Sequence, residues 1–399
     1  MFISFFLLII SFLTINVTVN VTVVASDKYT VEGNTKTTTN HILFLIERCK
    51  RNNKGETTNE LKQCLLNSRL FSSVAIDKNV IKVKERWTLI PIPELKFSND
   101  NRSFGVFVIE SNFLGMGKLL FVGGKFGSVE RALFFFYKDR NLFYSEWTGD
   151  LSVSTGSRNL KTYQKKDELY AIKENAKNIH IRFGQNINHH FSLNLGIQHS
   201  NLSYQTMIPY VQPNDFSYFA AGPELTYNDS NYKLYFNEGH QIRINYIQQL
   251  QRSDNDKKSA RIEYSWANQL NLTLDHVLQL RLSGFNIVNS NLRDSIKTGG
   301  SIGYRGVQSG GLWMKRSNNL SMDYLVPFLK AKYGTWIAAP FADYAIYDSY
   351  YNTDRNFFSY GIGSYLYLKE IAIPGVGLIV GINNKFLKNF VSFSMGMGM

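Results

Sequence analysis

The sequence has 399 residues and contains no long hydrophobic run beyond its first 25 residues. A membrane-spanning helix needs about 20 consecutive apolar residues, so a polytopic helical membrane protein is excluded. Charged residues are scarce, at 19% compared with roughly 25% in soluble domains. Aromatic residues, at 14%, are too frequent for an intrinsically disordered chain.

The chain instead combines many aromatic residues and few charges with a mean hydropathy of −0.20. This combination is typical of a transmembrane β-barrel, in which outward apolar residues alternate with polar residues that face the lumen. We therefore expect a transmembrane all-β fold.

The N-terminus predicts export. Residues 1–15 are apolar but too short for a comfortable membrane span, and a polar stretch leads to Ser26 and the first charges, Asp27 and Lys28. This pattern predicts a signal peptide over residues 1–26. The alternative is an uncleaved anchor, because no Lys or Arg precedes the apolar run. The net charge of +13 is compatible with nucleic-acid binding, but export argues against that partner, and we expect no nucleic acid.

The chain has only two cysteines, Cys49 and Cys64. An even number of cysteines in an exported chain permits a disulfide. Such a bridge closes a loop of about 15 residues, which is worth about 3 kcal/mol in the chain-entropy model. Two buried free thiols are the alternative.

Residues 27–86 predict a small α+β domain. Thr57 and Glu60 have the spacing of a capping box, which marks the start of its second helix. The expected elements follow the order β-α-α-β-β and cover residues 29–33, 37–49, 57–65, 70–76 and 80–85.

From Trp87 onward, apolar and polar residues alternate with a period of two. In residues 241–247, for example, Ile242, Ile244 and Tyr246 share one face. The pattern predicts strands with one face in lipid and one toward a polar lumen, and thus a 16-stranded antiparallel barrel over residues 87–399. The strand centres are expected near residues 94, 107, 121, 134, 147, 182, 196, 222, 245, 264, 281, 323, 341, 361, 378 and 394.

Three long intervals between these centres predict extracellular loops, because periplasmic turns are short. They cover residues 155–177, 203–215 and 288–316. The first contains a cluster of basic residues, which either meet anionic lipid headgroups or are simply solvated. They are Lys161, Lys165, Lys166, Lys173 and Lys177.

Several motifs occur in an order that resembles the BamA/TamA-type outer-membrane assembly and translocation superfamily, the bacterial surface antigen barrels. The glycine-rich stretch 299–310 has the core Gly303-Tyr304-Arg305-Gly306, which is similar to the inward-folded loop of that family. Further similar segments are residues 31–35 and 65–74 of a single POTRA (polypeptide-transport-associated) domain, residues 90–91 and 110–117 near the barrel start, and residues 322–327 and 341–344.

This resemblance implies insertion or translocation of polypeptides through a laterally opening barrel in the outer membrane of a Gram-negative-type cell. Outer-membrane lipids and polypeptide clients would be its partners. The POTRA domain would lie in the periplasm and bind periplasmic or lipoprotein partners by strand addition. Two alternatives stay open: a POTRA domain that serves only as a rigid spacer, and a passive outer-membrane pore for small solutes.

The inward loop also makes a physical prediction. An arginine buried in a lumen must be paired, and its planar fork can bind a carboxylate with two hydrogen bonds. We predict that Arg305 reaches Asp343, Asp323 or both, in segments where Phe341 also matches the family pattern. The alternative is an arginine solvated in a wide pore.

The first and last strands should form a weak seam. Pro91 and Pro93 donate no ladder hydrogen bonds, and Gly396 and Gly398 weaken the strand that contains Phe393. In the family that the sequence resembles, this seam is the lateral gate. Alternatively, these residues only relieve strand curvature.

The sequence offers no candidate catalytic residue. It has no Gly-x-Ser-x-Gly elbow and no P-loop, and its histidines lack the spacing of metal ligands. We therefore expect no enzyme activity, no metal and no cofactor, and a hydrolase is the weakest of the functional hypotheses.

Overall fold

The computed structural model describes most of the chain after residue 28. Residues 1–26, with the expected signal peptide, and Gly396 and Gly398 lie outside the described part. No helix within that part is long and apolar enough to cross a membrane. The described residues are 29–51, 57–98, 101–164, 167–188, 190–206, 214–233, 236–254, 256–273, 275–289, 291–299, 303–307, 310–350, 355–368, 374–385 and 389–395.

The described chain begins with a small α+β domain that has the predicted β-α-α-β-β order and is compatible with a POTRA domain, the name we use for it below. Its three-stranded sheet has the order β1-β3-β2, with β1 parallel and β2 antiparallel to β3. The elements are β1 (Thr30–Glu32), α2 (Thr39–Arg51), α3 (Thr58–Asn67), β2 (Phe71–Asp77) and β3 (Val80–Glu85).

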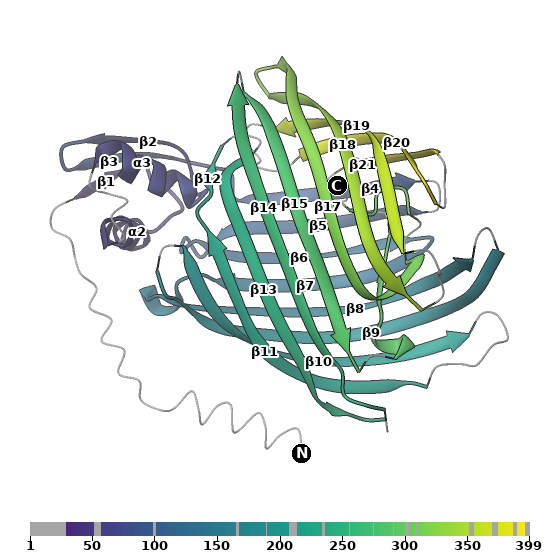
Figure 1. Ribbon diagram of the computed structural model, residues 1–399. Helices are drawn as coiled ribbons and strands as arrows, with labels where there is room; N and C mark the ends of the chain where they lie inside the picture. The colour runs from purple at the N-terminus through teal and green to yellow at the C-terminus, as the bar shows by residue number, and fades with distance from the viewer. Residues whose placement is uncertain are drawn as a thin grey trace.

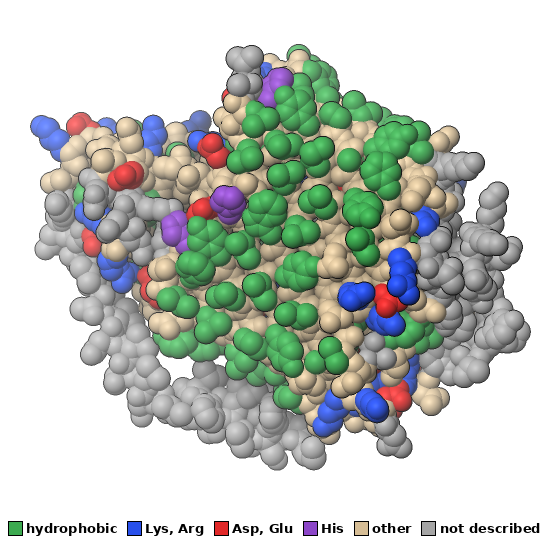
Figure 2. Space-filling view, in the orientation of Figure 1, with side chains coloured by type: hydrophobic (Ala, Val, Ile, Leu, Met, Phe, Trp, Pro, Cys, Tyr) green, Lys and Arg blue, Asp and Glu red, His purple; other side chains and the backbone are tan. Residues whose placement is uncertain are grey.

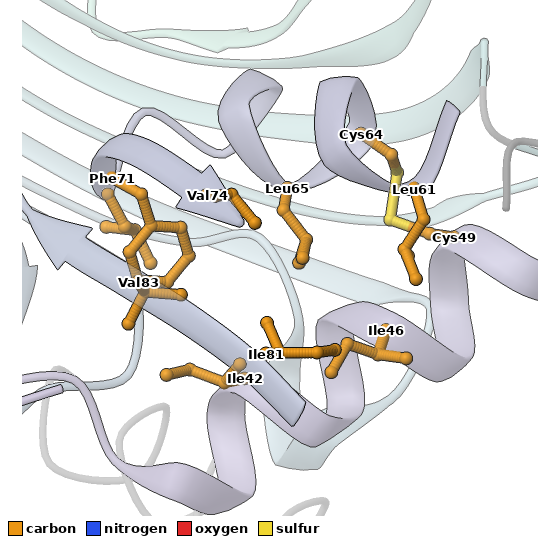
Figure 3. Close-up of a cluster of buried hydrophobic side chains, with 11 residues drawn as sticks. Ile42, Ile46, Cys49, Leu61, Cys64, Leu65, Phe71, Val74, Ile81 and Val83 are labelled. Carbon is orange, nitrogen blue, oxygen red and sulfur yellow. A yellow bond between two sulfur atoms is a disulfide. The ribbon is translucent and has the colours of Figure 1, made fainter. Parts of the chain in front are cut away.

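Both helices of this domain pack their apolar faces on the sheet (Figure 3). Ile42 and Ile46 of α2 and Leu65 of α3 are almost completely buried, together with Ile81 of β3. Helix α3 starts at the predicted capping box, in which the Thr57 hydroxyl accepts from the Glu60 N–H and the Glu60 carboxylate accepts from the Thr57 N–H.

A disulfide joins the two helices. Cys49 lies in α2 and Cys64 in α3, and their Cα atoms are 6.1 Å apart (Figure 3). Both residues belong to the buried cluster of the domain. The structure therefore has the bridge that the sequence permitted.

The rest of the chain forms a closed antiparallel barrel of sixteen long strands (Figure 1). Two short strands, β12 (Asn231–Tyr232) and β16 (Ile296–Thr298), pair at its margins. The long strands are β4 (Leu89–Ser98), β5 (Arg102–Phe113), β6 (Lys118–Gly127), β7 (Glu130–Asp139), β8 (Trp147–Gln164), β9 (Asp167–Asn186), β10 (Phe191–Thr206), β11 (Phe216–Asn228), β13 (Asn237–Arg252), β14 (Ala260–Thr273), β15 (His276–Val288), β17 (Leu312–Lys330), β18 (Gly334–Ser349), β19 (Asn356–Leu368), β20 (Pro374–Asn383) and β21 (Asn389–Met395).

The two faces of the wall differ as the alternation predicts. Apolar side chains cover the outer face over β13, β14 and β15 (Figure 2), where Ile244 and Ile262 are exposed. Inside, Arg182 of β9 donates to Asp150 of β8 and to Glu224 of β11. An apolar exterior around a charged interior is the arrangement of a transmembrane β-barrel.

The prediction of an extracellular loop over residues 155–177 is wrong. Residues 155–177 belong to strands β8 and β9, which pair without a break from Trp147–Gln185 to Thr162–Tyr170. The centres expected near 147 and 182 therefore mark only one end of each strand. The error arose because the far halves of these strands are polar on their outer faces, as at Thr155 and Lys177, so they lack an apolar stripe.

Three residues of the basic cluster therefore lie on strands and not in a loop: Lys161, Lys173 and Lys177. Lys165 and Lys166 lie outside the described residues, as do residues 207–213 of the second expected loop.

Polar contacts fix the POTRA domain against one end of the barrel. The Lys36 ammonium forms an ion pair with Glu110 of β5, and the Thr38 N–H donates to the Gly115 carbonyl over 2.9 Å. On the other side of the domain, Arg48 is 3.3 Å from Glu146, in the connection between β7 and β8. The domain and the barrel thus meet over several strand connections.

Glu85 organises this junction. Its carboxylate accepts hydrogen bonds from the Thr35 hydroxyl and from the backbone N–H groups of Thr35, Lys36 and Thr37, at 2.6–3.1 Å. Burial by itself would raise the pKa of Glu85, but hydrogen bonds from Thr37, Thr35 and the Lys36 backbone outweigh it and lower the pKa to about 2.

We predict that the junction titrates at unusually acidic pH. A carboxylate with a depressed pKa stabilises the folded state above its ordinary pKa, and this contribution is lost as the pH falls through the folded value. The amide resonances of residues 35–37 should therefore move with a midpoint near pH 2. In Glu85→Gln these shifts should disappear, and a wild-type midpoint near pH 4 would contradict the assigned contacts.

Candidate functional site

The connection between β15 and β17 turns back into the barrel. It contains a short 3₁₀ helix, η2 (Leu292–Asp294), followed by β16, which pairs with β17. Two buried ion pairs hold this part of the connection: Arg252 of β13 is 2.7 Å from Asp294, and Lys297 is 2.9 Å from Glu174 of β9. The loop thus contacts β9 and β13 on its inner side and pairs with β17.

Arg305 lies further along this loop and is 95% buried, with a relative exposure of 5%. Its Nη1 and Nη2 donate to the two oxygens of Asp323 over 2.7 and 3.1 Å. Its Nε and Nη2 donate to the two oxygens of Asp343 over 3.0 Å each. One guanidinium therefore binds two carboxylates, each through two hydrogen bonds. Its carbon also lies 4.0 Å from the ring centroid of Phe341.

The two carboxylates are themselves held by the wall. Asp323 on β17 also accepts from Arg281 of β15 over 2.7 Å, and Asp343 on β18 accepts from the Ser359 hydroxyl of β19 over 3.2 Å. The two arginines balance the two aspartates, so the cluster is neutral as a whole. We define Arg305, Asp323, Asp343 and Arg281 as the arginine cluster.

The residues beside Arg305 shape the loop. Gly303 and Gly306 have φ angles of 85° and 81°, which strongly favour glycine. Tyr304 is buried, its hydroxyl hydrogen bonds with Ser317, and its ring packs 5.8 Å from that of Phe357. The predicted motif thus supplies two tight bends around a tyrosine anchor.

Gly306 also brings the loop against the last two strands. A Cβ atom at this position would lie 2.3 Å from the Phe390 ring of β21, so only glycine fits. The Gly306 carbonyl accepts from Asn383 of β20 over 3.1 Å. Sequence analysis did not identify Asn383 or Phe390. Alternation could show only that they share a strand face, and not that the loop reaches them.

The seam between the last and first strands is short in the described chain. β21 pairs with β4 only from Ser392–Ser98 to Met395–Leu95, with the rings of Phe393 and Phe97 6.4 Å apart. By contrast, β4 pairs with β5 over its full length, from Leu89–Glu110 to Phe97–Arg102.

The predicted seam residues that the structure describes lie on both strands of the seam. Pro91 and Pro93 lie on β4, toward the POTRA domain from the stretch that pairs with β21. Phe393 lies within the paired stretch. The arginine cluster is connected to this strand pair through Phe341, whose ring lies 6.4 Å from Phe390.

Comparisons with known proteins agree with this geometry. The Omp85 superfamily domain matches residues 112–383, so the chain belongs to the Omp85 superfamily. It has the fold of a transmembrane β-barrel of the outer-membrane type, preceded by a small α+β domain that is compatible with a POTRA domain. No curated protein matches the sequence.

Similar solved structures share the fold at low identity. BamA from Haemophilus ducreyi lacking POTRA domains 1–3 is 14% identical with a TM-score of 0.60, covering 92% of this chain and 83% of that one. CdiB from Escherichia coli is 13% identical with a TM-score of 0.59, covering 84% and 70%. CdiB from Acinetobacter baumannii is 11% identical with a TM-score of 0.56, covering 85% and 68%.

Among the described residues, no group of three or more His, Cys, Asp or Glu side chains could hold a metal ion. The chemistry of the arginine cluster is instead that of a structural clamp. Each carboxylate receives charged hydrogen bonds, and the arrangement ties a loop to adjacent strands.

We predict that Arg305→Ala destabilises the barrel by about 3–5 kcal/mol, because it leaves buried carboxylates without their partner. The measurement is the denaturant midpoint of the full chain in detergent, together with heat-modifiable gel mobility. Arg316→Ala is the matched control, since Arg316 is exposed on β17. Equal midpoints for Arg305→Ala and wild type would show that the cluster does not clamp the loop.

Proposed function

We propose that this protein inserts or translocates polypeptides through a barrel that opens at the β4–β21 seam. The observation that carries the proposal is that, among the described residues, β21 pairs with β4 only from Ser392–Ser98 to Met395–Leu95, in a chain that belongs to the Omp85 superfamily. The barrel would act without covalent chemistry, as an assembly or transport device and not as an enzyme.

The seam supplies the physical basis. Opening a barrel exposes a row of backbone N–H and C=O groups on each edge strand, and an incoming strand can pair with them. The penalty for opening is smallest where the fewest interstrand hydrogen bonds are lost. The proline residues at 91 and 93 reduce the donors available on β4 further.

The orientation we propose places the POTRA domain in the periplasm. The connections at the POTRA end include the tight turn between β5 and β6, whereas the loop between β15 and β17 lies at the other end. Short periplasmic turns and longer extracellular loops are usual in outer-membrane barrels. The POTRA domain would then be available to periplasmic or lipoprotein partners and to clients.

The interior supports a second candidate, a passive pore for small solutes. Arg182 and Arg243 flank Glu224, and such charges could select solutes in a channel. The inward loop argues for the first candidate, because its ion pairs with β9, β13, β17 and β18 hold it within the interior.

A disulfide across the seam tests the proposal. Ser394 and Lys96 are paired, so cysteines at these two positions lie on adjacent strands and can be bridged by oxidation. We expect the oxidised pair to lower the levels of other outer-membrane or exported proteins as strongly as depletion does, and reduction to restore them.

The matched control is a cysteine pair at Ser154 and Asn178, which face each other on β8 and β9 away from the seam. This bridge should leave activity unchanged. Full activity of a completely bridged seam would reject lateral opening. A large, steady conductance without any effect on other proteins would favour the passive pore.

A further inference from the structure

A second distinctive surface lies on the outside of the barrel, at the end away from the POTRA domain. Strand register aligns the outward side chains of β6 to β10 in rows across the wall. Among the rows that cross all five strands, the one farthest from the POTRA domain contains Phe126, Arg131, Ser157, Asn175 and Ser203. The next contains Gly124, Leu133, Thr155, Lys177 and Asn201.

The character of the wall changes directly below these two rows. The third row is apolar on four of its strands, with Val122, Phe135, Val153 and Ile179 all exposed. Exposed aliphatic and aromatic side chains on a barrel exterior mark the hydrocarbon layer. The two rows above combine cations, hydroxyls and amides with the exposed Phe126 and Leu133, a mixed composition that indicates the level of the lipid headgroups.

The wall is hollowed at this level. A groove of about 500 Å³ lies over both rows. Thr155 and Ser157, which are small, lie in its middle strand, while the larger Phe126, Leu133 and Lys177 line its sides.

The groove is cationic. Arg131 and Lys177 both line it, and neither forms an ion pair with another described residue. The neighbouring carboxylates have other partners: Glu130 is bound by Lys125 and Arg158, and Glu174 by Lys297. Because β7 and β9 are two strand spacings apart and the two cationic residues lie in successive rows, their backbones are about 12 Å from each other.

We propose that this groove binds the anionic phosphate headgroup of a lipid in the outer leaflet. Arg131 can hold a phosphate with two hydrogen bonds, and Lys177 supplies a second charge. The hydroxyls and amides of the two rows offer hydrogen bonds to headgroup oxygens. The apolar row below would take the acyl chains, which favours an amphiphile over a free phosphate.

The assignment to the outer leaflet rests on the proposed orientation. Binding of an anionic headgroup would also provide a role for part of the net charge of +13. Contact with lipid headgroups would also explain why the outer faces of β8 and β9 are polar and lack the apolar stripe expected of a membrane-spanning strand.

Binding can be tested on the full chain in detergent, without any client. Native mass spectrometry would measure its affinity for diphosphoryl lipid A and for phosphatidylethanolamine. We expect Arg131→Gln/Lys177→Gln to weaken diphosphoryl lipid A binding about 25-fold, since each basic residue contributes about fivefold at a membrane surface. Ser157→Leu, which fills the groove and keeps both charges, should also weaken it.

The control is Lys257→Gln/Lys258→Gln, which removes two exposed charges from the connection between β13 and β14. It should bind lipid as the wild type does. Unchanged affinity in the Arg131/Lys177 variant, or equal wild-type affinity for both lipids, would overturn the groove assignment. Heat-modifiable mobility verifies that each variant is folded.

A separate experiment tests the orientation. A cysteine at Lys177→Cys should react with a membrane-impermeant maleimide on intact cells, because the two native cysteines are already bridged. Failure to react in cells, together with normal lipid binding of the wild type in detergent, would place the groove in the inner leaflet. The orientation in the proposed function would then fail while lipid binding stands.

Discussion

The hydrogen-bonded contact of one buried guanidinium with two carboxylates is the constraint on which the interior depends. Arg305 can be buried because Asp323 and Asp343 together accept four hydrogen bonds from its guanidinium. Arg281, which donates to Asp323, balances the second negative charge. Burying such a cluster gains little stability compared with apolar packing, but losing one member is expensive. The cluster therefore specifies where the loop lies more than it stabilises the barrel.

The position of the loop bears on the seam between the last and first strands. Gly306 packs against Phe390, and its carbonyl accepts a hydrogen bond from Asn383. The loop that contains Arg305 therefore also contacts β20 and β21. Over its described residues, the last strand has seven residue pairs with β20 and four with β4. In this account the clamp supports one side of the seam, and the other side is left free to open.

Much of the fold was predictable because its signals are local. Capping at Thr57 and period-two alternation indicate elements within a few residues, and the lumen location of Arg305 required a carboxylate partner. The far halves of β8 and β9 were missed because outward polar residues such as Thr155 and Lys177 interrupt the apolar stripe. Contacts of Gly306 with Asn383 and Phe390 depend on barrel closure, which joins residues far apart in the sequence.

Amide hydrogen exchange of the folded full chain tests the central claim most directly. It compares β4 and β21 with β9 and β10, which pair along nearly their full lengths. The account predicts that the seam amides exchange much faster than those of β9 and β10, and that Arg305→Ala accelerates exchange in β20 and β21 further. Equal protection around the whole barrel, or no response of β20 and β21 to the substitution, would contradict it.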